Sequence, residues 1–185
     1  MGDPAPIVAL SAAPPARLAA ALYAGVAEDG ARAARLRTGA AQAMAAVPED
    51  LDVARWFQAV VELGFLVASA DGFADEERRG LARLLEKLTA EAVDHELLET
   101  NFRELERGVA AMGRGPRLAR AAADVDASLV DDTLGLVALI AMADGELGAP
   151  EGAALTELGS HLGYSADQVR AVIDRVAARL EGQLR

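Results

Sequence analysis

The sequence repeats one short stretch, which reads LVASADG at residues 66–72 and LIAMADG at residues 139–145. The two copies align with an offset of 73 residues, and each is an apolar run that ends in Ala-Asp-Gly. Glycine readily adopts the left-handed conformation that ends many helices. The repeat therefore predicts two buried helices, each followed by a tight turn.

Amphipathic helices are predicted to follow each copy. After the first copy, Asp75 caps a helix with leucines at helical spacing, and Thr89 opens another that runs to about Met112. After the second copy, one helix begins at Pro150 and the last begins at a Ser165 capping box. The two repeats then span about residues 53–112 and 127–182.

The composition agrees with a helical chain. Hydrophobic residues make up 52% of the 185 residues, but 43 of these are alanine, and aromatic residues make up only 4%. Alanine favours helices, whereas strands are rich in β-branched and aromatic residues. We therefore expect an all-α fold, a compact bundle of about eight helices with an internal two-fold repeat and no strand.

Three segments are expected along the chain. Residues 1–15 hold four of the seven prolines and form an extended or disordered arm. Residues 16–47 form an alanine-rich helical extension, and residues 48–185 form the domain that contains the repeats. The thin apolar stripe of the extension means that it must pack on this domain or on a partner.

Charge and cysteine content exclude several classes of function. The chain has 18 basic and 29 acidic residues, a formal net charge of -11, and no cysteine. Acidity opposes binding to nucleic acid and anionic membranes, and the lack of cysteine excludes disulfides and thiolate metal sites. The longest apolar runs are roughly half of the ~20 residues that span a bilayer, so we expect a cytoplasmic protein without direct membrane insertion.

The repeat resembles the tellurite-resistance TerB-like family, which is also related to the N-terminal domain of the DjlA co-chaperone. The resemblance rests on ADGEL (143–147) followed by Glu151, on ADGFADEE (70–77), and on the closing GYSADQVRAVI, and it covers about residues 50–182. Phe73 departs from the family pattern, which usually has glutamate there. The resemblance implies an all-helical module that assembles with other proteins in stress-response systems.

The resemblance also implies that acidic residues around the two Asp-Gly turns chelate metal. The candidate ligands are Asp71, Asp75, Glu76, Glu77, Asp144, Glu146 and Glu151. All-oxygen ligands favour Ca²⁺, Mg²⁺ or Mn²⁺. The residues themselves leave an alternative open, in which the aspartates cap the following helices and bind no cation.

Candidate partner-binding residues lie at two places. They are the apolar side chains Ile7, Val8 and Leu10 of the arm, and the basic residues Arg114, Arg117 and Arg120. A basic group next to an acid-rich segment favours contacts with other proteins or with a second copy of the chain. The two histidines, His95 and His161, are expected on different helices without a ligand partner nearby.

No catalytic sequence motif is present, so a non-enzymatic role is expected. The leading hypothesis is a TerB-like module in a stress-response, tellurite-resistance-like or membrane-associated complex, with a divalent cation at the Asp-Gly turns. The alternative is a structural adaptor that docks through its arm and alanine-rich helices and binds no metal.

Overall fold

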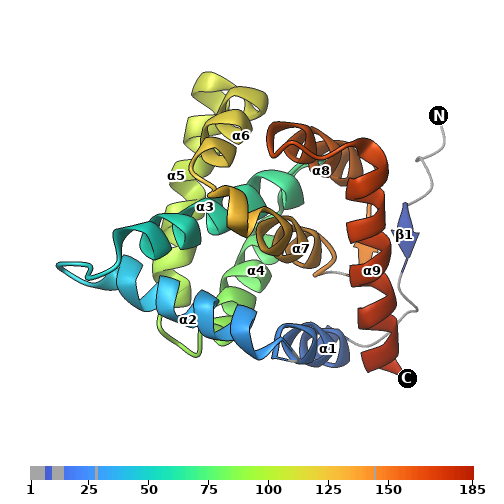
Figure 1. Ribbon diagram of the computed structural model, residues 1–185, viewed down its shortest axis with the longest axis horizontal. Coiled ribbons are helices and arrows are strands. Elements are labelled where there is room, and N and C mark those ends of the chain that lie inside the picture. Colours follow the sequence, from blue (N-terminus) through green and yellow to red (C-terminus); the bar gives the residue numbers. More distant parts are fainter. Residues whose placement is uncertain (1–6, 10–14, 28, 144) are drawn as a thin grey trace.

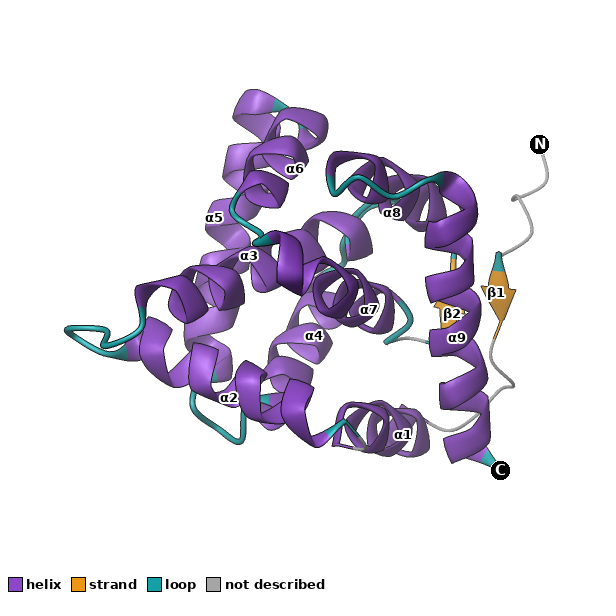
Figure 2. Cartoon of the chain, viewed as in Figure 1, coloured by secondary structure: helices purple, strands orange, loops and turns teal. Residues whose placement is uncertain are grey.

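The computed structural model describes residues 7–9, 15–27, 29–143 and 145–185, and the side chains of Glu76 and Glu77 are among the few left out. The described residues form an all-α bundle (Figures 1 and 2). In chain order its elements are β1 (Val8–Ala9), α1 (Pro15–Ala27), α2 (Gly30–Met44), α3 (Leu51–Ala68), α4 (Asp75–Leu88), α5 (His95–Met112), α6 (Arg114–Ala123), the 3-10 turn η1 (Ala127–Leu129), α7 (Val130–Ala141), β2 (Glu146–Leu147), α8 (Ala149–His161) and α9 (Ala166–Leu184). The expected fold class is confirmed.

Helices α3 and α7, the buried helices of the two repeats, lie at the centre of the bundle (Figure 1). They approach closely at Gly64, where an added Cβ atom would lie 2.8 Å from Cδ1 of Ile140. A second contact is polar, because the indole N–H of Trp56 donates a hydrogen bond of 2.8 Å to the Thr133 hydroxyl. Trp56 and Thr133 are both buried, so this bond satisfies two polar groups inside the core.

The sequence repeat extends to the backbone of the two turns. Residue Ser69 after α3 has φ −91° and ψ 15°, and Met142 after α7 has φ −90° and ψ 13°. Gly72 and Gly145 both have positive φ, at 121° and 99°. Their N–H groups donate to the Ser69 and Met142 carbonyls over 3.3 and 3.0 Å. The two turns therefore close in the same way, as the alignment predicts.

The N-terminal helices share the core of the repeats. Helix α2 packs along α3, and α1 packs against α9. Leu22 and Val26 of α1 and Leu36 of α2 are buried in the same apolar cluster as the repeats. The expected packing of this segment on the rest of the molecule is thus observed.

Two features differ from the sequence prediction. The structure contains a short strand pair, in which Val8 pairs with Leu147 and Ala9 with Glu146 in antiparallel register (Figure 2). The prediction of no strand was wrong because these segments lie far apart in sequence and are too short to show a period.

Helix α5 begins later than predicted. Thr89 does not open this helix, because its hydroxyl donates to the Leu85 carbonyl and closes α4. Ala90 and Glu91 then adopt positive φ, and Asp94 caps α5 by accepting the Glu96 N–H.

Among the described residues, no helix combines the length and apolar character that crossing a lipid bilayer requires.

We predict that Thr133→Val destabilises the protein by about 1–3 kcal/mol, because it removes the acceptor of the buried Trp56 N–H. Chemical denaturation measures the change in the free energy of unfolding. The exposed Thr100→Val variant is the control and should change it by less than about 0.5 kcal/mol. Equal losses in both variants would contradict the role of this bond.

Candidate functional site

The acidic candidates around the two Asp-Gly turns lie in different environments. Asp71, Asp75 and Glu146 are exposed, whereas Glu151 is buried with 7% of its surface accessible. Asp75 forms an ion pair with Arg78 of its own helix. Asp144 and the side chains of Glu76 and Glu77 lie outside the described part of the structure, so their predicted ligand roles are not placed.

The fold brings Asp71 of the first turn close to Gly148, which lies three residues after the second turn. A Cβ atom added to Gly148 would lie 4.0 Å from Oδ2 of Asp71 and 3.4 Å from Oε2 of Glu151. One carboxylate from each repeat therefore reaches the same small region of the structure. This convergence joins acidic groups that are far apart in the sequence.

Glu151 takes part in capping α8, the helix that follows the second Asp-Gly turn. Its carboxylate accepts the Gly148 N–H over 2.8 Å at the start of α8. Negative charge is favoured at this end of a helix, where the N–H groups lack backbone partners. In the described part of the structure Asp71 has no hydrogen-bond or ion-pair partner, so capping by the aspartate is not seen in the first repeat.

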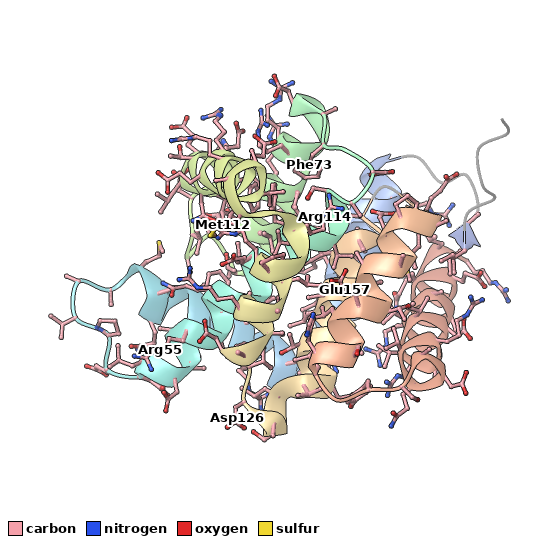
Figure 3. The ribbon with its side chains drawn as sticks, turned by 90° about the horizontal axis from the view of Figure 1, so that it is seen from above. Arg55, Phe73, Met112, Arg114, Asp126 and Glu157 are labelled. Atoms are coloured by element: carbon pink, nitrogen blue, oxygen red, sulfur yellow. The ribbon has the colours of Figure 1, made fainter. Side chains whose placement is uncertain are left out.

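Arg114 stabilises the first Asp-Gly turn from outside the repeat. Its guanidinium donates to the carbonyls of Ser69 over 2.5 Å and of Ala70 over 3.0 Å. These carbonyls follow the end of α3, where positive charge is favoured. Arg114 lies at the start of α6, beside this turn (Figure 3). It therefore offsets the negative end of the α3 dipole, next to which Asp71 lies.

The three arginines predicted to form one basic partner-binding group behave differently. Arg117 donates two hydrogen bonds to Glu62 of α3, over 3.0 and 2.5 Å, and Arg114 is engaged by the turn. Arg120 is exposed. Two of these side chains are thus held within the chain, because α6 packs on α3, and their partner-binding role stays a prediction.

The described part of the arm is also held within the chain. Ile7 donates its N–H to the Leu147 carbonyl over 2.8 Å. A Cβ atom added to Gly152 would lie only 2.0 Å from Cδ1 of Ile7. The side chain of Ile7 therefore packs directly on the backbone of α8. Val8 is half-buried in the strand pair, and Leu10 lies outside the described residues. Partner binding by these residues stays a prediction.

A histidine-carboxylate cluster appears where the sequence indicated none. The side chains of Glu86, Asp94 and His95 bring ligand atoms within 4.8 Å of one another, and no other such cluster of three occurs in the described regions. His95 Nδ1 lies 3.0 Å from Glu86 Oε1 and 4.0 Å from Asp94 Oδ1. The prediction of an isolated His95 was wrong because the helix start was placed at Thr89 instead of after Asp94.

Hydrogen bonding within this cluster already accounts for its geometry. Glu86 also accepts the His95 backbone N–H, and Asp94 accepts the Glu96 N–H as the cap of α5. The bond to Glu86 raises the pKa of His95 and lowers that of Glu86. The cluster therefore acts first as an ion pair that joins the end of α4 to the start of α5.

Comparison of the chain with protein-family models, with curated proteins and with solved structures gives no match.

We predict that Arg114→Met lowers the free energy of unfolding by about 1.5–3 kcal/mol, because the carbonyls of Ser69 and Ala70 lose a charged donor. Arg120→Met on the same helix is the control and should change it by less than about 0.5 kcal/mol. Urea titration of both variants measures the difference. A loss no larger than that of the control would show that Arg114 does not support the turn.

The ion pair of His95 and Glu86 predicts a dependence of stability on pH. The pKa of His95 is raised in the folded state. Its contribution to the free energy of unfolding is therefore complete below pH 6.5, the ordinary pKa, and is lost as the pH rises through the folded-state pKa. The pKa of Glu86 is lowered in the folded state. Its contribution to stability is therefore lost as the pH falls below 4.5, the ordinary pKa, and through the folded-state pKa. The stability difference between wild type and His95→Gln should thus be larger at pH 5.5 than at pH 8. A difference that is constant with pH contradicts the pairing.

Proposed function

We propose that this protein is a non-enzymatic, TerB-like helical module that acts in a stress-response or membrane-associated protein complex. The observation that carries the proposal is the convergence of the two Asp-Gly turns at Gly148. The described residues of the two turns have matching backbone conformations, and Asp71 and Glu151 reach the same region from different repeats. This arrangement supports the resemblance that the repeated sequence suggests.

A divalent cation at the paired turns is part of the proposal. Asp71 is exposed and lacks a partner in the described part of the chain, so its oxygens are accessible to an ion. Carboxylates and backbone carbonyls are the ligands that Ca²⁺, Mg²⁺ and Mn²⁺ prefer. Binding would join the two repeats and tune the stability of the module.

The alternative role as a metal-free adaptor receives less support. In that role the arm and the alanine-rich helices dock on another protein. The side chain of Ile7 instead packs on α8, and α1 and α2 contribute to the core. Deleting residues 1–47 would therefore unfold the protein rather than test docking alone.

The cation is tested by thermal unfolding with EDTA, Ca²⁺, Mg²⁺ or Mn²⁺. A ligand present at 100 times its Kd stabilises the native state by about 2.7 kcal/mol, which raises the Tm of a chain of this size by about 5–10 °C. We expect one of these ions to raise the Tm of the wild type and to have no effect on the Asp71→Asn/Asp144→Asn variant.

The Asp124→Asn variant is the control, because it removes one exposed carboxylate away from the turns and should keep the shift. If no ion raises the Tm of the wild type, or if the double variant keeps the shift, the paired turns do not hold a cation.

A further inference from the structure

Helix α4 carries a row of three exposed cationic side chains, Arg79, Arg83 and Lys87, which we call the basic row. They are spaced four residues apart and therefore lie on the same side of the helix, about 6 Å from one to the next. None of the three has an ion-pair or side-chain hydrogen-bond partner in the described part of the chain.

The basic row differs from the eight arginines of this protein that form ion pairs among the described residues. The arginines that form ion pairs with carboxylates among the described residues are Arg32, Arg35, Arg78, Arg103, Arg117, Arg170, Arg175 and Arg185. Acidic residues exceed basic residues by enough to give a net charge of -11. Three neighbouring cations without a partner among the described side chains thus form a local region of positive charge on an acidic molecule.

A hollow of about 760 Å³ lies beside the basic row, between α1 and α4. Its lining residues are Ala20 and Tyr23 of α1, Gly80, Arg83, Leu84 and Lys87 of α4, and Ala90 and Glu91 of the following turn. The lining is mostly apolar and includes two cations of the row, Arg83 and Lys87, and the carboxylate of Glu91. An apolar side chain fits this hollow while an acidic group beside it contacts the row.

Gly80 keeps this hollow open. It lies inside α4, where glycine is less favourable than alanine. Packing does not require it, because a Cβ atom added there would meet no atom within 4 Å. The absence of a side chain at this position therefore leaves space that no other part of the described structure fills.

We propose that the basic row and the adjoining hollow bind an acidic segment of a partner protein. Carboxylates spaced four residues apart on a helix repeat at about 6 Å, which matches the spacing of the row. An apolar side chain of the same segment occupies the hollow beside Tyr23 and Gly80. Binding at this surface requires no metal ion, so the proposal is independent of the proposed metal site at the Asp-Gly turns.

Charge favours a short acidic segment over a larger polyanion. A segment contacts the three cations alone, whereas a nucleic acid or an anionic bilayer also meets the acidic surface around them. The cations steer the acidic segment to this face and make binding sensitive to salt.

Fluorescence anisotropy with a labelled helical peptide tests the proposal on the full chain. The probe is an alanine-based peptide that has glutamate at three positions four residues apart and leucine beside them. We expect the Arg79→Gln/Arg83→Gln/Lys87→Gln variant to bind it about tenfold more weakly than the wild type, because three surface ion pairs are lost. The control variant Arg103→Gln/Arg107→Gln/Arg170→Gln carries the same net charge and should bind like the wild type.

The hollow is tested separately with Gly80→Leu, which fills it and keeps every charge. This variant should bind the peptide more weakly, while its Tm is no lower than that of the wild type because leucine favours the helix. A probe with glutamine in place of glutamate should bind weakly to every variant.

Equal binding by the row variant and the charge-matched control would overturn the proposal. The proposal would also be overturned if the row variant still bound the peptide but no longer bound anionic lipid vesicles. The same holds if it still bound the peptide but no longer self-associated in sedimentation at low salt. Those results would assign the row to a membrane or to a second copy of the chain.

Discussion

The packing of α3 on α7 is the constraint on which the rest of the structure depends. Gly64 lets the two helices approach until Ile140 fills the space of a side chain, and the bond from Trp56 to Thr133 fixes how they lie along each other. In the same bundle, Asp71 of the first Asp-Gly turn lies beside Gly148, three residues after the second turn. Helices α4 and α8 follow those turns, and α5 and α9 then complete the two repeats.

Much of this arrangement could be predicted from the sequence because it depends on local patterns. The apolar runs at 66–72 and 139–145 predicted the central helices, and the shared Ala-Asp-Gly predicted their equivalent turns. The capping box of Ser165 and Gln168 predicted the start of α9, which the structure confirms. In each case the signal and the structure that it predicts lie within a few residues of each other.

The features that could not be predicted join residues that are distant in sequence. Nothing near Arg114 indicates that its guanidinium bonds the carbonyls after α3. The contact of His95 with Glu86 required the correct start of α5, and the pairing of Val8 with Leu147 involves strands of two residues. Convergence of Asp71 and Glu151 likewise follows from how the two repeats pack, which a periodic pattern does not specify.

The strand pair that joins Val8 to Leu147 has a consequence for the order in which the protein is made. A ribosome releases residue 8 early, but its partner emerges only after both buried helices have been synthesised. The first strand therefore lacks its partner until α1 to α7 have all been synthesised, so the strand pair forms late in biosynthesis.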